Sequence, residues 1–206
     1  MCGFEKNEPL QILLEDNWRY DSATGKTLGP IFDSELESGV NEQINYELSA
    51  HYTYLSMSYH FDQDEYYLPG FSKFFKEMAE EEHEHAQIFM KYQNKRGGKI
   101  RLNSIPSPCN DGYWGNGTEA MKSALRLEQL INEHLINLHS LGEEKAESQF
   151  LDFLESNFLG EQVDSIKEIS NYVHILRKID SPLGEFQFDQ LTLGGACGRQ
   201  ECKSRT

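Results

Sequence analysis

A glutamate and a histidine that could bind one metal ion, Glu82 and His85, lie three residues apart in a long segment with helical periodicity. At this spacing both side chains project from the same face of a helix. Two further acids, Glu47 and Glu128, and the amide of Gln162 occupy comparable central positions in three other such segments. Carboxylate and imidazole ligands without thiolate suit iron or manganese better than copper(I), although zinc would also bind. The pattern therefore indicates a metal centre assembled from several helices.

Each of these polar residues interrupts an apolar stripe whose members recur about every 3.5 residues. One polar residue on such a stripe is usually an edge position or a snorkelling side chain, but four interruptions at one level are not explained in this way. Burying three glutamates without partners is costly, no lysine or arginine lies on the stripes, and a cation is the simplest compensation. The stripes are Val40, Ile44, Glu47, His51, Tyr54, Ser58, Phe61; Phe71, Phe75, Met78, Glu82, His85, Phe89, Tyr92; Met121, Leu125, Glu128, Ile131, Leu135, Leu138; and Leu151, Leu154, Phe158, Gln162, Ser165 or Ile166, Ile169, Val173, Leu176.

Four long helical segments must position these residues. The first and third links between them are shorter than ten residues, as in antiparallel hairpins, whereas the second, from Gly97 to Gly117, has about 20 residues. An extended link of that length reaches ~65 Å, and a helix of about 28 residues is only ~42 Å long. We therefore expect an all-α, up-down, crossover, up-down four-helix bundle with a short fifth helix near the C-terminus. The expected helices are Asp33 to Phe61, Pro69-Gly70 to Gly97-Gly98, Thr118-Glu119 to Gly142, Ala146 to Asp180, and Leu183 to Leu193.

The polar residues should lie at the same level of this bundle. Glu47 lies 14 residues before the end of the first helix, and Glu82 lies 12 residues after the start of the second. Glu128 and Gln162 lie 14 and 16 residues from the two helix ends at the third link. Antiparallel pairing therefore brings all four to the middle of the bundle.

The fourth helix makes the predicted centre asymmetric. Carboxylate-bridged di-iron bundles take a Glu from each of two helices and a Glu-x-x-His motif from each of the other two. This chain has one complete motif, whereas the corresponding place in the fourth helix holds Gln162 and Ser165. One metal position is therefore expected to be strong and the other weak, which suits iron that passes through after reaction.

The composition excludes several other classes of protein. The chain has 206 residues, a formal net charge of −15 and a mean hydropathy of −0.64. No apolar run approaches the ~18 residues needed to span a bilayer, so we expect no membrane partner. The acidic charge disfavours nucleic acid, which requires a basic face. We divide the chain into an irregular N-terminal extension (1–32), a bundle domain (33–194) and a polar, cysteine-containing tail (195–206).

The compartment is expected to be the cytoplasm. The N-terminus has no apolar signal region, and four cysteines are too few and too widely spaced for a disulfide scaffold or a structural zinc site. Secretion remains the alternative because of the cysteines near the termini and the sequon at Asn116, which would matter if a signal peptide had been removed.

Several short stretches between residues 31 and 194 closely resemble a known family. They are NYELSA (45–50), YLSMSY (54–59), EEHEHA (81–86), QNKRGG (93–98), LE (127–128), EQV (161–163) and FDQLTLG (188–194). The chain is similar in these stretches to ferritin, specifically to the ferroxidase-active heavy-chain type.

The resemblance implies a 24-subunit shell that stores ferric oxyhydroxide, built from one subunit type or mixed with a second. It implies oxidation of iron(II) by dioxygen at a centre that holds two iron ions per subunit transiently, as iron(II) and then iron(III). The first iron would bind Glu47, Glu82 and His85, with Glu82 bridging to a second iron on Glu128. Gln162 would orient the dioxygen side of this centre.

The resemblance also assigns residues outside the metal ligands. Tyr54 would hydrogen-bond the centre and take part in electron transfer, and Glu81 and Glu84 would pass or nucleate iron at the inner surface. From the sequence alone, a solvated acidic helix face explains this last pair equally well. Iron would enter through three-fold channels lined by His139, Asp152 and Glu155.

The chain departs from the family pattern in a few places. Gln87 stands where many heavy chains carry another inner-surface acid, and Gln187 makes the expected four-fold axis, with Leu183 and Leu191, more polar than usual. The extension and the tail with Cys197 and Cys202 lie outside the resemblance.

Four alternatives fit less well. A non-catalytic, light-chain-like subunit would lack the ferroxidase ligands, and a helical signalling bundle would have no reason to bury acids at one level. Another di-iron carboxylate oxidase needs a second Glu-x-x-His motif, which the fourth helix lacks. A DNA-protecting mini-ferritin is disfavoured by the net charge and by the fifth helix.

Overall fold

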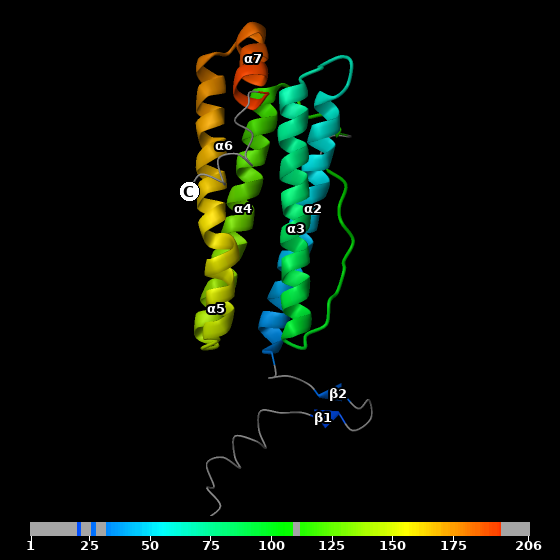
Figure 1. The fold of residues 1–206 in the computed structure, drawn as a ribbon, viewed down its shortest axis with the longest axis vertical. Coiled ribbons are helices and arrows are strands. Elements are labelled where there is room, and N and C mark those ends of the chain that lie inside the picture. The colour runs from blue at the N-terminus through cyan, green and yellow to red at the C-terminus, as the bar shows by residue number, and fades with distance from the viewer. Residues whose placement is uncertain (1–19, 22–25, 28–31, 109–111, 195–206) are drawn as a thin grey trace, which may run out of the picture.

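The computed structural model describes residues 20–21, 26–27, 32–108 and 112–194, and a four-helix bundle forms most of this part (Figure 1). The helices of the bundle are α2 (Ser34–Phe61), α3 (Pro69–Lys95), α4 (Gly117–Glu144) and a fourth rod of three segments, α5 (Ser148–Leu154), η2 (Glu155–Leu159) and α6 (Gly160–Lys178). A short helix follows, formed by α7 (Pro182–Phe188) and η3 (Asp189–Leu193). The predicted fold class is therefore confirmed.

The order of the helices in space agrees with the predicted crossover. Figure 1 shows the described parts of the link between α3 and α4, residues 96–108 and 112–116, on the outside of the bundle between the lower end of α3 and the upper end of α4. These two helices therefore run in the same direction, while α2 with α3 and α4 with α6 form the antiparallel pairs. Within the described residues, no helix is both long enough and apolar enough to cross a membrane.

Capping side chains fix where two of the long helices begin. Asp33 accepts hydrogen bonds from the backbone N–H groups of Glu35 and Leu36, at 2.8 and 3.3 Å. At the start of α4, Asn116 accepts from the backbone of Glu119, whose own side chain accepts from the Asn116 N–H. Such reciprocal bonds satisfy donors that the first helical turn leaves without partners. Asn116, the sequon residue, is thus a helix cap.

Two local features differ in form from the expected outline. The fourth helix is continuous in direction but contains a π-helical turn at Glu155–Leu159, where the backbone bonds span five residues. The wider turn lets Leu154, Phe158 and Gln162, spaced four residues apart, all remain buried. In the N-terminal extension, β1 (Tyr20–Asp21) pairs antiparallel with β2 (Lys26–Thr27). The four cysteines lie outside the described residues.

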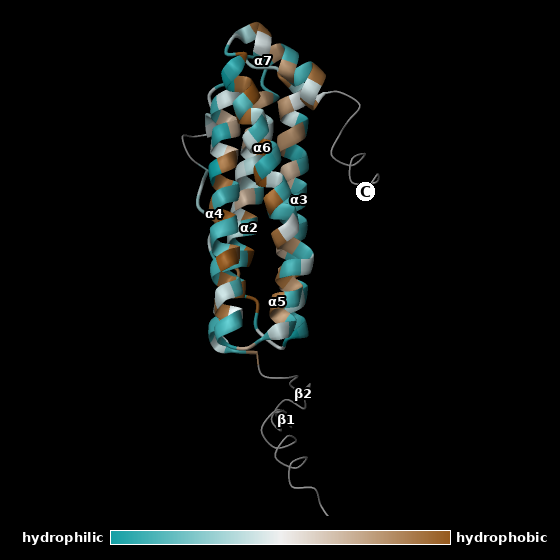
Figure 2. Cartoon of the chain, turned by 90° about the vertical axis from the view of Figure 1, so that its left-hand side faces the viewer, coloured by the Kyte–Doolittle hydropathy of each residue, from teal (hydrophilic) through white to brown (hydrophobic). Residues whose placement is uncertain are grey.

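The core follows the stripes read from the sequence. Each apolar stripe residue is buried or partly buried, and Figure 2 shows hydrophobic and hydrophilic residues alternating along every helix of the bundle. Aromatic rings fill the end of the bundle near α7, where Phe71 lies 5.1 Å from Phe61 and 5.7 Å from Phe188 between ring centroids. The polar stripe residues Glu47, Glu82 and Glu128 are buried inside this apolar frame, at 1, 3 and 1% exposure.

A buried acid attaches the short C-terminal helix to the start of α3. Asp189 is fully buried, and its Oδ1 atom accepts a hydrogen bond from the Phe71 N–H at 2.8 Å. Gly70 permits this approach, because a Cβ atom there would lie 2.3 Å from the Asp189 carbonyl oxygen. Burial raises the pKa of the Asp189 carboxyl above its ordinary value, although the Phe71 and Gly70 N–H groups act in the opposite direction.

Replacing Asp189 with alanine is expected to lower the free energy of unfolding by about 1–3 kcal/mol, because the Phe71 N–H loses its acceptor in a buried place. Asp189→Asn keeps an oxygen acceptor, so its free energy of unfolding should fall by less.

The pH dependence of stability gives a second expectation for Asp189. The folded state binds the proton of this carboxyl more tightly than the unfolded chain does, because the folded pKa is raised. Asp189 therefore makes the free energy of unfolding fall as pH rises from about 3.9, the usual carboxyl pKa, through the raised folded value. Urea unfolding at several pH values measures both effects. Equal losses in the alanine and asparagine variants would contradict the acceptor role.

Candidate metal centre

Three side chains from α2 and α3 converge in the middle of the bundle. Glu47, Glu82 and His85 each offer one ligand atom, and these atoms all lie within 4.8 Å of one another. Glu47 comes from α2, and the other two come from one face of α3, as their spacing in the sequence predicts. Even His85, the most accessible of the three, is only 9% exposed. The group is therefore a buried, three-ligand site of mixed carboxylate and imidazole character.

The electrostatics of Glu47 favour a cation at this group. Its Oε1 atom accepts a 2.6 Å hydrogen bond from Gln43, but apart from the Glu82 carboxyl no described group bonds to its buried Oε2 atom. Burial, and next the negative charge of Glu82, raise the pKa of Glu47 well above its ordinary value, while His85 and Gln43 lower it by less. Two facing carboxyls of this kind need either a shared proton or a cation between them. A divalent metal supplies that charge, so the donor set fits iron(II).

His85 connects this group to the fourth helix. Its Nδ1 atom lies 3.4 Å from Glu82 Oε2, and its Nε2 atom lies 3.3 Å from Glu161 Oε2. Burial by itself lowers the pKa of His85, but the Glu161 hydrogen bond and the charges of Glu47, Glu161 and Glu81 raise it overall. Glu81, His85 and Glu161 form a second, partly exposed set of ligand atoms within 4.8 Å. His85 thus faces carboxylates on both of its ring nitrogens.

Neutral hydrogen-bond donors hold the third buried acid, Glu128. The Tyr54 hydroxyl donates to its Oε1 atom at 2.5 Å, and the Gln162 amide donates to its Oε2 atom at 2.5 Å and to its backbone oxygen at 3.1 Å. Glu128 and Gln162 therefore lie at one level, as their distances from the helix ends predict. Among the described residues, Glu128 belongs to neither group of three convergent metal ligands. The ligands are thus unevenly distributed, because Glu47, Glu82 and His85 converge on one another while Glu128 is held by neutral donors.

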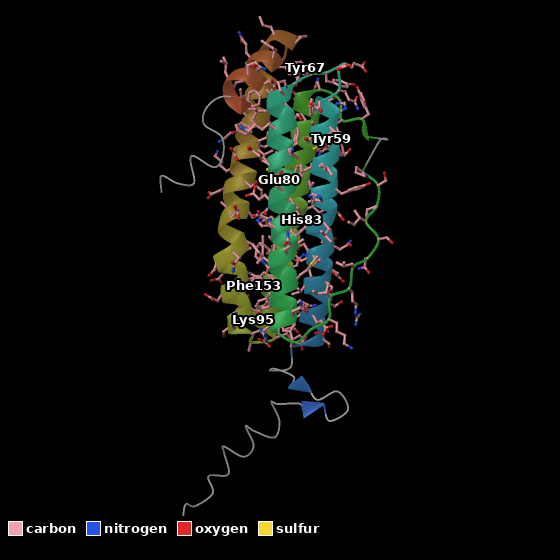
Figure 3. All side chains as sticks on the ribbon, turned by 45° about the vertical axis from the view of Figure 1, so that its right-hand side comes forward. Tyr59, Tyr67, Glu80, His83, Lys95 and Phe153 are labelled. Atoms are coloured by element: carbon pink, nitrogen blue, oxygen red, sulfur yellow. The ribbon has the colours of Figure 1, made fainter. Side chains whose placement is uncertain are left out.

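The remaining predicted residues lie apart from this centre. Glu81 is in the second ligand set, whereas Glu84 is exposed on α3. Figure 3 shows Glu80 and His83 on the outward side of the same helix, away from the core-facing stripe. Near the end of the bundle opposite α7, His139 Nε2 lies 2.9 Å from Glu155 Oε1, and Asp152 is exposed on α5. On the C-terminal helix, the remaining predicted residues, Leu183, Gln187 and Leu191, are exposed.

Comparison with known proteins decides the family. The model of the ferritin-like domain matches residues 37–179. The soma ferritin of Lymnaea stagnalis is 52% identical over 165 residues, which cover 80% of this chain and 94% of that protein. The chain belongs to the ferritin family. The ferritin heavy chain of Echinococcus granulosus is 48% identical over 164 residues, covering 80% of this chain and 94% of that protein.

The names of ferritin relatives do not distinguish catalytic from non-catalytic subunits. The oocyte isoform of the ferritin light chain of Xenopus laevis is also 43% identical, over 166 residues that cover 79% of this chain and 93% of that protein. Catalysis by this ferritin therefore depends on its own ligand residues.

The sequence alone did not single out three polar residues around the centre. Glu161 directly precedes Gln162, so a helical wheel could have placed it at the rim. Gln43 lies four residues before Glu47 and thus on the same helix face. His134 had no such signal, because its Nδ1 atom lies 2.5 Å from Gln43 Oε1, a contact that depends on how α2 and α4 pack.

Proposed function

We propose that this chain is a ferroxidase-active ferritin subunit, which oxidises iron(II) with dioxygen at the buried centre. The observation that supports the proposal best is the convergence of Glu47, Glu82 and His85 within 4.8 Å in an apolar core. Burial of this many acidic and basic groups is otherwise costly. A light-chain-like subunit has no use for such a set, so the structure favours the catalytic reading over that alternative.

The roles of the residues follow from their positions. Glu47 and His85 would hold the first iron(II), and Glu82, which lies between them, would also reach the second. Glu128 would bind the second iron(II), with its carboxylate oriented by Tyr54 and Gln162. Each of the two iron(II) ions gives up one electron, and dioxygen takes both electrons and two protons from solvent, which reduces it to hydrogen peroxide. Because the second position has few ligands, the iron(III) product is expected to leave the centre for storage as ferric oxyhydroxide.

We further propose a shell of 24 subunits, formed from this chain alone or with a second subunit type. The exposed apolar side chains of the C-terminal helix support this assembly, since Leu183, Phe186 and Leu191 are 66, 53 and 76% exposed in the single chain. His139 and Glu155, which are already in contact, would line the iron entry channels with Asp152. Glu81 and Glu84 would pass or nucleate iron at the inner surface, and Glu161, which contacts His85, would also pass iron to the centre. We place the protein in the cytoplasm, with secretion as the alternative.

The purified full chain is expected to oxidise iron(II) within seconds of mixing and to elute as a particle of about 24 subunits. Stopped-flow absorbance after addition of iron(II) in air measures the first property, and size-exclusion chromatography with light scattering measures the second. A monomeric chain, or one that oxidises iron(II) no faster than buffer does, would contradict the proposal.

A further inference from the structure

Two hydrogen bonds connect His134, at the edge of the bundle, through Gln43 to Glu47, and neither His134 nor Gln43 has a role in the proposed reaction. Gln43 Nε2 donates to Glu47 Oε1 over 2.6 Å, and Gln43 Oε1 lies 2.5 Å from His134 Nδ1. At the outer end, His134 Nε2 lies 3.5 Å from Glu42 Oε2. These hydrogen bonds thus join α4 to the metal-ligand face of α2.

The direction of these hydrogen bonds is fixed by chemistry. The NH₂ group of Gln43 faces Glu47, and Glu47 is an ionised carboxylate when it binds a metal, so it can only accept this hydrogen bond. The amide oxygen of Gln43 then faces His134, and His134 Nδ1 must carry the hydrogen that this oxygen accepts. His134 therefore sets the orientation of the Gln43 amide, and Gln43 sets the orientation of the Glu47 carboxylate.

Burial prevents water from replacing the hydrogen bonds that connect His134, Gln43 and Glu47. Gln43 is fully buried, so water cannot take the place of a lost partner at its amide. His134 is partly buried, with its ring 4.6 Å from the ring of Tyr46. It lines a surface pocket of about 360 Å³ together with Glu42. The imidazole is therefore held in place while its outer edge faces solvent.

We propose that His134 and Gln43 are positioning residues for the first iron site, which hold Glu47 with its second oxygen, Oε2, turned toward the metal. The inference rests on the proposed ferroxidase function. Neither residue touches the iron, and both act through Glu47. Removing a residue that hydrogen-bonds to a metal ligand typically lowers metal affinity by 10–100-fold.

His134→Leu is expected to weaken metal binding at the first site by about tenfold, as for other residues that support a metal ligand through hydrogen bonds. His134→Asn places an N–H donor near the position of Nδ1 and should restore affinity to within about twofold of the parent chain. The probe is cobalt(II), titrated without iron and followed by its visible absorption, which also reports the ligand geometry. His174→Leu, at an exposed histidine of α6, is the matched control and should bind cobalt(II) like the parent chain.

The kinetic form of the same test uses iron(II). The iron(II) concentration that half-saturates the initial rate should rise in His134→Leu by about the same tenfold factor, with a smaller change in the maximal rate. Gln43→Met, which removes the amide and keeps the side-chain length, should give a similar loss. Because the two residues act in series, His134→Leu should add little loss in the Gln43→Met background.

The outcomes separate the inference from the function on which it rests. A parent chain that neither binds cobalt(II) at the centre nor oxidises iron(II) rapidly would overturn both. An active parent chain with unchanged affinity in His134→Leu, or losses that add fully in the double variant, would overturn the positioning role alone. If His134→Leu fails to assemble, Gln43→Met compared with the parent chain decides the question at the Glu47 end.

Discussion

Replacing both Glu82 and His85 with alanine is expected to lower the initial rate of iron(II) oxidation by more than about 100-fold. This loss exceeds the 10–100-fold that is typical when a residue that only hydrogen-bonds to a metal ligand is removed. The double variant keeps Glu47 but removes two of the three convergent ligands, so no well-held first iron remains. The shell should still assemble, because the change relieves the repulsion between Glu82 and Glu47 and leaves the outer surface intact. Stopped-flow absorbance and light scattering measure the two properties on one sample.

The chain contains its own matched control for this experiment. Glu80 and His83 have the same residue types at the same spacing on the same helix, but both are exposed on the outward side of α3 (Figure 3). Glu80→Ala with His83→Ala therefore removes the same charges without touching the buried centre, and it should oxidise iron(II) at the parent rate. Equal rates in the two double variants would show that the buried pair is not the site of oxidation.

The helical bundle was predictable because burial imposes a period on the sequence. Apolar residues at helical spacing defined four stripes, and the lengths of the links allowed one connection to span the bundle. The polar interruptions then had to meet at one level, and the Gln162 to Glu128 hydrogen bond at 2.5 Å agrees with that registration. Such features follow from local spacing and chain length, which a single sequence contains.

Other features depend on contacts between residues distant in sequence and could not be predicted in this way. Asp189 reads as a polar residue of a terminal helix, and only packing shows that it accepts a hydrogen bond from α3. His134 lies 91 positions from Gln43, and no periodicity links the two. The π-helical turn before Gln162 also gives no pattern in the sequence, since it changes the stripe spacing by less than one residue.

The proposed second metal position has few ligands because residue 162 is a neutral amide. Gln162→Glu is expected to make the two metal positions more alike. In the parent chain the Gln162 amide donates to Glu128 Oε2 at 2.5 Å. A glutamate there loses the donor and places two buried carboxylates face to face, which should destabilise the metal-free protein by about 3 kcal/mol or more. The same carboxylate adds a ligand to the second metal position, so the variant should bind a divalent ion there more tightly.

Zinc(II), which has no redox chemistry, measures this change without turnover. Because a ligand that binds only the folded state raises its stability, Zn(II) should raise the melting temperature of Gln162→Glu more than that of the parent chain. Gln162→Met loses the donor without adding charge, so it should be destabilised but gain no extra stabilisation from Zn(II). With iron(II), Gln162→Glu should oxidise a first pair of ions per subunit and then slow, because the product is retained. Equal Zn(II) effects in the glutamate and methionine variants would mean that residue 162 does not face the second metal, and the weak second site would then need a cause other than this amide.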